Sequence, residues 1–453
     1  MMSSAYSKLT RRCLSLLKIG TLKSSFNVRL NFLETFKERL LRILIFANWF
    51  WTSWCPKPRE CKHHRQDFSK AHRFLFARLH FEILSRQKTP KKLRAALQKL
   101  PDNLGDIYDS LMDRILSAED EKDIAIYALK WVTYSRERLP INALLHAIAV
   151  ELGLEGDDIE DDDLIDPKDL LSSCGGLLVF DEESDVVRLV HYTTQTYLEG
   201  AFAKREANTL IAKTCLTYLA LDVFQNELSL DSLTSEFMRQ YSLGGYASTH
   251  WGHHVGEGNE EEVEQQIIHV FRDQHVRDCV EGMKMVHEYG RTYKCSKFSL
   301  LHLISINGLS RVCATLFKRQ VDIDVESRDA KGRSPLTWAA HNGHLQVVKL
   351  VLDAGAKVGS ADEEGHTPLS CAARNGYLDV VKWLLHASYG VDSGDELDAL
   401  TALRWATMTG HLEVVKLLLD AQTKKNPSFG QRAFGWAATY GHFEVMKLLM
   451  NNM

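Results

Sequence analysis

The sequence predicts a mainly helical protein with one β-hairpin and a C-terminal solenoid of two-helix repeats. The first observation is a glycine that recurs near the C-terminal end, with spacings of 35, 33, 34 and 31 residues, at Gly308, Gly343, Gly376, Gly410 and Gly441. A period close to 33 residues is typical of stacked two-helix repeats. The second observation is the stretch GGLLVFDEESDVVRLVHYT, in which two apolar runs flank a polar turn, as in a β-hairpin.

The length and charge indicate several domains and a basic arm. A chain of 453 residues is long enough for about three domains. Residues 1–100 contain 22 Lys or Arg against 5 Asp or Glu, whereas the rest contains 33 against 54. This asymmetry predicts that the arm contacts an anionic surface or the acidic body itself. Residues 1–68 show no clear periodicity, so we assign this basic arm no fold.

The cysteines and the apolar segments indicate where in the cell the protein is expected and whether it crosses a membrane. The nine cysteines are scattered and odd in number, which predicts reduced thiols and an intracellular, cytoplasmic protein. The most apolar segment, Ile43 to Cys55, has 13 residues, and a transmembrane helix needs about 20. We therefore expect no membrane span. We interpret this segment as a buried helix, with a position in the bilayer interface as the alternative.

Helical spacing of apolar residues begins at Ser69. Two short helices are predicted in 69–100, a third over 103–117, a fourth up to about Ser135, and a fifth from Ile141 to Leu152. An acidic loop, the hairpin and a closing helix, TTQTYLEGAFAKR, follow. Residues 101–205 therefore combine three helices, a hairpin and a last helix, as in a winged-helix domain.

Several motifs carry a more specific resemblance. LPDNLGDIYDSLMDRI, CGGLLVF and RLVHYTTQTYLEG resemble a winged-helix module of the GPI inositol-deacylase type. That module follows the NACHT nucleotide-binding domain in fungal STAND-type proteins that end in ankyrin repeats. Residues 69–100 are similar to the last helices of the NACHT region. CLTYLALDVF and YASTHWGHHV, within 206–295, resemble the helical linker of the same proteins.

The C-terminal repeats resemble ankyrin repeats. SPLTWAAHNGHLQVVKLVLDAGA, TPLSCAARNGYLDVVKWLLHASY and TALRWATMTGHLEVVKLLLDAQT carry the pattern, and the units on either side are degenerate, as capping repeats tend to be. Residues 296–453 are thus expected to form about five repeats. We expect the glycines to end the first helices in a left-handed conformation. The residues expected to pack between neighbouring repeats are His344, His411, His442, Trp338, Trp405 and Trp436.

No motif predicts catalysis or a cofactor. A NACHT-type switch needs G-x-x-x-x-G-K-[ST] to hold the nucleotide phosphates, and the chain contains no such sequence. We therefore expect a protein that is not an enzyme, has no small-molecule substrate and binds no cofactor. The segment EGDDIEDDDLIDPKD carries nine acidic residues between the expected recognition helix and the wing. Because these acids would repel phosphates, nucleic acid is an unfavourable partner.

The sequence contains two groups of residues of the types that ligate metals. The C-x5-C-x-H-H run at 55–64 lacks the two spaced pairs of a zinc finger. His250, His253 and His254 are interpreted as side chains of a packed helix, some of them on its surface. We therefore expect no metal site from either group.

Function is expected at positions that the repeat pattern leaves free. In ankyrin proteins the partner usually meets the hairpin tips and the exposed positions just before each glycine. Carried onto this sequence, the resemblance implies that a partner contacts Lys331, Arg333, His341, Asn342, Glu364, His366, Arg374, Asn375, Met408, Thr409, Thr439 and Tyr440. Their mixture of charged, amide and aromatic groups suits a protein partner.

The resemblance as a whole implies a non-catalytic scaffold that binds a protein through the concave face of the repeats. Such a chain is expected to be the sensor half of a STAND-type signalling or non-self-recognition protein without its nucleotide-binding domain. Two alternatives stay open. In one, the chain is an adaptor that associates with a full-length NACHT homologue. In the other, the sequence is an incomplete gene model of a nucleotide-dependent STAND NTPase.

Overall fold

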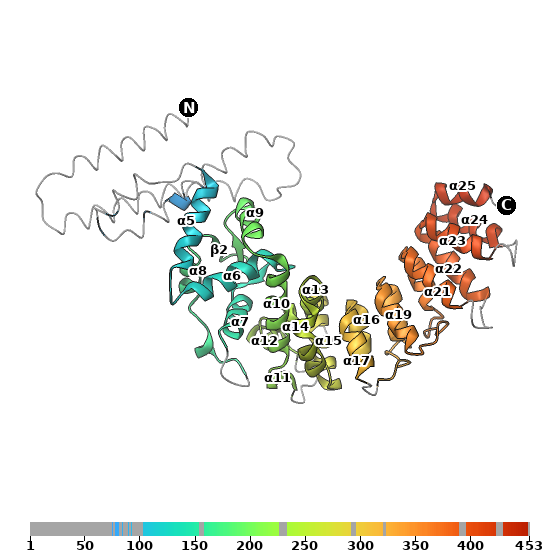
Figure 1. Cartoon of the computed structure of the whole chain (residues 1–453), viewed down its shortest axis with the longest axis horizontal. Helices are drawn as coiled ribbons and strands as arrows, with labels where there is room; N and C mark the ends of the chain where they lie inside the picture. Colours follow the sequence, from blue (N-terminus) through green and yellow to red (C-terminus); the bar gives the residue numbers. More distant parts are fainter. Residues whose placement is uncertain are drawn as a thin grey trace, which may run out of the picture. The chain divides into compact units, whose positions relative to one another are not determined.

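The computed structural model describes residues 103–153, 158–225, 233–290, 296–319, 323–388, 396–422 and 429–451, with a few single positions between 75 and 92. The chain divides into two compact units after Asp113, within helix α5 (Leu104–Leu116; Figure 1). The basic arm at 1–68, with Ile43 to Cys55, lies outside the described residues, as do nearly all of 69–100. No helix of the described part is long and apolar enough to cross a membrane.

Six elements after α5 form a small mixed region. Their order along the chain is α6 (Lys122–Tyr134), β1 (Leu139–Pro140), α7 (Ile141–Glu151), α8 (Pro167–Ser173), β2 (Leu178–Asp181) and β3 (Val186–Leu189). The three strands form one antiparallel sheet in the order β1-β3-β2, in which Val187 of β3 pairs with Leu139 on one side and Phe180 on the other. The hairpin predicted from the sequence is confirmed as β2 and β3.

The structure adds two elements that the sequence did not indicate. Strand β1 has only two residues, too few to show an alternating pattern. Helix α8 lies within the segment that was expected to be an acidic loop. Asp166 caps this helix, because its Oδ1 accepts the Lys168 N–H at 2.7 Å, and Pro167 occupies the first turn. The acidic loop expected before the hairpin is therefore interrupted by a helix, and the confirmed hairpin has a third strand paired to it.

Seven helices lead from the sheet to the repeats. They are α9 (Tyr192–Ala201), α10 (Lys204–Leu219), α11 (Asp222–Gln225), α12 (Ser235–Gln240), α13 (Gly244–Glu257), α14 (Glu260–Val270) and α15 (Gln274–Tyr289). Helix α13 packs against both α10 and α15, and the apolar faces of these helices form the core of this region. The single closing helix expected after the hairpin is two helices, since Phe202 is extended between α9 and α10.

A buried polar chain joins α10 to α13. The Tyr246 hydroxyl accepts the Arg136 N–H at 3.0 Å and donates to His254 Nε2 at 2.7 Å. The Nδ1–H of His254 donates in turn to Asn208 Oδ1 at 2.6 Å. Burial lowers the pKa of His254 to about 3, so this histidine is neutral at ordinary pH. The expectation that His254 belongs to a packed helix is confirmed.

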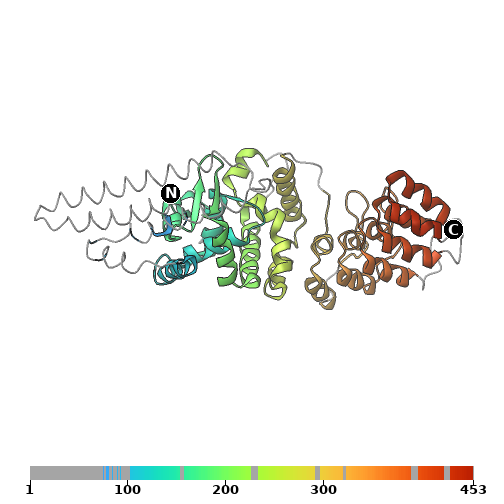
Figure 2. The same ribbon diagram turned by 90° about the horizontal axis from the view of Figure 1, so that it is seen from above.

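Five helix pairs complete the chain, as the repeating glycines predicted. They are α16 (Leu300–Asn307) with α17 (Ser310–Lys318), α18 (Pro335–His341) with α19 (Leu345–Asp353), α20 (Pro368–Arg374) with α21 (Leu378–Ser388), α22 (Glu396–Thr409) with α23 (Leu412–Gln422), and α24 (Phe429–Tyr440) with α25 (Phe443–Asn451). First helices pack on first helices, and second helices on second helices. Figure 2 shows the pairs in succession from gold to red.

Each repeat is joined to the one before it through the residues around the recurrent glycine. At Gly376 the backbone has a φ of 78°, and a Cβ atom there would lie 2.5 Å from Nδ1 of His411 in the next repeat. The ring of His411 lies there because its Nε2 donates to the carbonyl of Arg374 at 3.0 Å. The same hydrogen bond joins His344 to Ile306 and His442 to Met408. The expected packing role of these histidines is confirmed.

The helices before the repeats cover the first repeat. Helix α14 packs on α17 as α17 packs on α19. The carboxylate of Glu260 accepts the Val312 N–H at 2.8 Å near the start of α17, and Arg277 donates from Nε to the carbonyl of Phe298 at 2.9 Å. The apolar end of the stack is thereby shielded, which a solenoid requires at its terminal repeat.

Replacing Gly376 by Ala should destabilise the stack by about 2 to 4 kcal/mol, because a left-handed Ala costs about 1–2 kcal/mol and displacing His411 adds a packing cost of similar size. Two matched controls separate these effects. Gly355 has a φ of 95° but open space around it, and Gly359 has open space and no positive φ. Urea unfolding should show the largest loss of unfolding free energy for Gly376→Ala, a smaller loss for Gly355→Ala and the smallest for Gly359→Ala. Equal losses at Gly376 and Gly355 would contradict the steric role of His411.

Replacing Glu151 by Gln should stabilise the protein above neutral pH. Glu151 accepts the Thr214 hydroxyl, and burial raises the pKa of its carboxyl from 4.5 to about 7. Because the folded pKa is the higher one, the stability from this group is full below about pH 4.5 and is lost as the pH rises through 7. Thermal melts should show a larger gain for Glu151→Gln at pH 8 than at pH 5.5. A gain in melting temperature that is the same at both pH values would show that the pKa of the Glu151 carboxyl is not raised.

Candidate partner-binding site

Two equivalent turns precede α18 and α20, and an aspartate organises each of them. In the first, Asp329 Oδ1 accepts the N–H groups of Lys331 and Arg333 at 2.9 and 2.8 Å. Its Oδ2 accepts Nε of Arg333 and Nε1 of Trp338, both at 3.0 Å. The Asp329 side chain is fully buried. One carboxylate therefore fixes the turn, the arginine and the tryptophan together.

The second turn repeats this design with different side chains. Asp362 Oδ1 accepts the N–H groups of Glu364 and His366 at 3.0 and 2.7 Å, and its Oδ2 lies 3.3 Å from Nδ1 of His366. The turns are joined to each other, because the Glu363 N–H donates to the carbonyl of Lys331 at 3.1 Å. Neighbouring repeats thus present Arg333 and His366 at equivalent positions.

Arginines are stacked on tryptophan rings along this face. The guanidinium carbon of Arg333 lies 4.1 Å from the ring centroid of Trp338. That of Arg374, at the end of α20, lies 4.4 Å from the ring centroid of Trp405 on α22. Such cation–π contacts hold the guanidinium planes in place and leave the edges of the guanidinium groups able to donate hydrogen bonds.

A hollow of about 180 Å³ lies between the two turns and helices α18 and α20. Its lining comes from the turns and from the first helices of the repeats, with no residue from α19 or α21. The residues that line it are Lys331, Arg333, Thr337, Trp338, His341, Asp362, Glu364, His366, Ser370, Cys371 and Arg374.

The charges of Arg333 and Arg374 both affect the hollow. His341 lies in the hollow, and its pKa is lowered, first by burial and then by the positive charges of Arg333 and Arg374. His341 is therefore neutral near pH 7, and the hollow has a positive region bordered by the carboxylates of Asp362 and Glu364. An incoming anionic group would be attracted to the arginine side.

The structure brings six of the twelve expected contact residues together. Those around the hollow are Lys331, Arg333, His341, Glu364, His366 and Arg374. Three of the others make bonds within or between helices: Asn375 donates to the carbonyl of His341 at 2.8 Å, Asn342 to that of Trp338, and Thr409 to that of Trp405.

The remaining three expected residues lie along later repeats. Thr439 donates to the carbonyl of Gly435 at 2.8 Å, within its own helix. Met408 is half-buried, and its carbonyl accepts the hydrogen bond of His442. Tyr440 is 53% exposed. These residues do not line the hollow, so any contact that they make with a partner lies further along the stack.

Sequence reasoning missed two kinds of residue at this site. Trp338 was assigned to packing between repeats, yet its half-buried ring also lines the hollow and carries Arg333. Asp362 was not singled out, although it shapes the second turn. A signal for Asp362 exists in the sequence: D-x3-[RH] occurs 33 residues apart at 329–333 and 362–366.

The comparisons with known proteins concern the repeat region. A family model described as ankyrin repeats (3 copies) matches residues 301–395 and 387–453. Residues 301–453 are ankyrin repeats. Ankyrin repeats are generally protein–protein interaction modules. Among 355 matching chains of solved structures is the human ASB11 ankyrin repeat domain, which is 26% identical, with 34% of this chain and 69% of that chain covered and a TM-score of 0.30. No curated protein matches this chain.

Replacing Asp329 by Ala should destabilise the repeats by about 3 kcal/mol, the low end for breaking a buried ion pair, because Arg333 is partly exposed. Four donors lose their acceptor in this variant. Asp362→Ala is the matched control. The Asp362 carboxylate holds only its own turn, so this substitution should lower the free energy of unfolding by less. Urea unfolding of the two variants measures the difference. Equal losses would show that Asp329 has no special role in holding Arg333 and Trp338.

Proposed function

We propose that this protein is a scaffold that binds a protein partner in the groove lined by α18, α20 and the turns before them. The observation that supports this proposal is that Arg333 and Arg374 are both stacked on tryptophan rings and both line one hollow on the repeat surface. Arginine and tryptophan contribute most to binding energy when they are held rigidly at protein interfaces. Both arginines are held by contacts within the repeats.

The chemistry of the groove favours a partner segment with a carboxylate side chain. A guanidinium donates two parallel N–H groups that match a carboxylate. His341 beside them is neutral and adds no charge of its own, so the arginines supply the attraction for the carboxylate. Asp362 and Glu364, which also line the hollow, favour a basic or polar residue next to that carboxylate. The groove therefore suits a segment of mixed charge.

We also infer that α6 to β3 form a winged-helix module. The order helix, strand, two helices and hairpin, with β1 pairing on β3, supports this inference. Helix α8, which directly precedes the hairpin, then occupies the place of a recognition helix. It begins at the acidic cap Asp166 and carries Asp169 in its first turn. Those charges favour a packing role over DNA binding.

The domain limits that we propose are 101–205 for the winged-helix module, 206–295 for the helical linker and 296–453 for the repeats. Together with the resemblance described above, they support a sensor role in a STAND-type protein. An adaptor that pairs with a NACHT homologue is the alternative. The two are distinguished by whether such a homologue copurifies with the chain.

Charge reversal in the groove tests partner binding. We expect Arg333→Glu with Arg374→Glu to remove the proteins that copurify specifically with the full chain, since the groove then repels a carboxylate. Lys416→Glu is the control, because Lys416 is exposed on α23, a second helix outside the groove. Affinity purification with quantitative mass spectrometry compares the three chains, after circular dichroism has shown equal folding. An identical set of partners for all three chains would refute partner binding in the groove.

A further inference from the structure

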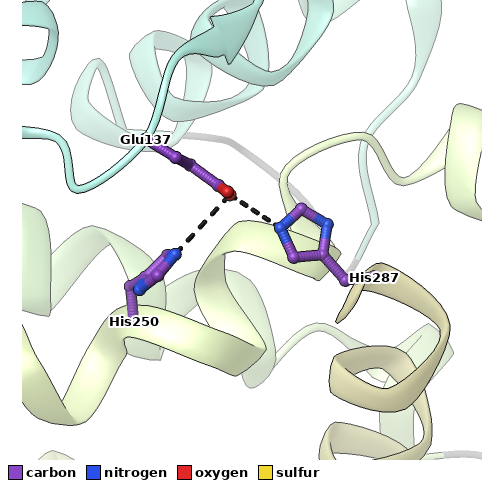
Figure 3. Close-up of side chains that lie close together, drawn as sticks. All are labelled: Glu137, His250 and His287. Atoms are coloured by element: carbon purple, nitrogen blue, oxygen red, sulfur yellow. Dashed lines mark hydrogen bonds and ion pairs between the residues drawn. The ribbon is translucent and has the colours of Figure 1, made fainter. Parts of the chain in front are cut away.

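Three side chains with metal-ligating atoms converge away from the repeats. Glu137 lies in the turn between α6 and β1, His250 on α13 and His287 on α15 (Figure 3). Oε1 of Glu137 is 2.7 Å from Nε2 of His287 and 3.6 Å from Nε2 of His250. One atom from each side chain lies within 4.8 Å of the other two. Residues 113 and 150 positions apart in the sequence are thereby brought to one point.

One of these atoms forms only a long ion pair within the protein, between Nε2 of His250 and the carboxylate of Glu137. Nε2 of His250 is buried and has no hydrogen-bond partner. Its separation from Glu137 exceeds hydrogen-bond distance. A buried polar atom left unpaired costs about 1–3 kcal/mol. A ligand at the point where the three groups meet would satisfy it.

The surrounding residues hold the three groups in place. The Tyr246 hydroxyl accepts the N–H of Arg136, so the residue before Glu137 is tied to α13. The ring of Tyr246 also packs against that of His250, with 4.8 Å between centroids. His287 lies against Gly245, where a Cβ would come within 2.6 Å of its Nδ1. A side chain larger than hydrogen at 245 would push His287 away from Glu137.

We propose that Glu137, His250 and His287 bind one divalent transition-metal ion, with zinc as the best fit. Zinc takes nitrogen at about 2.0–2.1 Å and carboxylate oxygen at about 2.0–2.2 Å, so donors around a tetrahedral ion lie about 3.3 Å apart. The two separations from Glu137 lie on either side of that value. Two imidazoles exclude magnesium and calcium, which prefer oxygen ligands.

The site is open to solvent on one side. The side chains of Glu137 and His287 are 38% and 32% exposed, so water can complete the coordination of the ion. To ligate through Nε2, His287 must present the lone pair of that atom to the ion, so the hydrogen bond between Nε2 and Glu137 is replaced by coordination. The ion then joins the turn before β1 to α13 and α15.

Cobalt titration of the full chain, carrying no polyhistidine tag and stripped of metal by dialysis against a chelator, tests the site. We expect one equivalent of Co²⁺ to bind with the visible absorption of four-coordinate cobalt and without thiolate charge-transfer absorption. Zinc should displace the cobalt and raise the melting temperature. Glu137→Gln, His250→Gln and His287→Gln should each abolish saturable binding. His253→Gln, on the same helix but outside the cluster, should bind as the unaltered chain does.

Two further variants make the outcome decisive. The Cys55→Ser, Cys61→Ser double variant removes the other candidate ligands and should bind cobalt unchanged. Gly245→Ala should weaken binding about tenfold or more, as displaced supporting groups do at metal sites. Binding that survives Glu137→Gln, in a chain shown by circular dichroism to be folded, would overturn the proposal. Binding that is lost in the cysteine variant would do the same.

Discussion

The contact of Gly308, Gly343, Gly376 and Gly410 with the repeat that follows each of them is the constraint on which the solenoid depends. The left-handed glycine ends the first helix and leaves room where a Cβ would lie, and the ring of the following repeat fills that room. At Gly376 and Gly410 the ring belongs to His411 and His442. Each histidine also satisfies a helix-terminal carbonyl of the preceding repeat, which otherwise has no partner within its helix. Steric fit and hydrogen bonding therefore set the same spacing between repeats.

The regular stack explains why the groove lies where it does. Since neighbouring repeats superpose, the turns around Asp329 and Asp362 project from the same side and are joined by a backbone hydrogen bond. Their side chains are free to vary, and here the first turn presents Arg333 and the second His366. The surface between them combines rigidity from the repeat with chemistry specific to this chain. This combination is typical of recognition surfaces on solenoids.

The region before the repeats follows a different principle. Its helices α13, α14 and α15 contact the first repeat, and α13 and α15 also contact the turn that carries Glu137. The polar chain from Arg136 through Tyr246 and His254 to Asn208 is buried and fully paired. Buried polar groups that are all satisfied specify one arrangement of their helices. The position of Glu137 beside His250 and His287 results from that arrangement.

The sequence by itself determined the repeats, the hairpin and most helices, because these depend on local periodicity and on glycine at helix ends. Of the twelve positions that it named as partner contacts, six lie around one hollow. It did not indicate β1, whose two residues form a strand only by pairing with β3. Only the tertiary structure decided that Trp338 supports Arg333, and that Glu137, His250 and His287 meet. Contacts between residues more than 100 positions apart depend on how helices pack, and no local pattern records that packing.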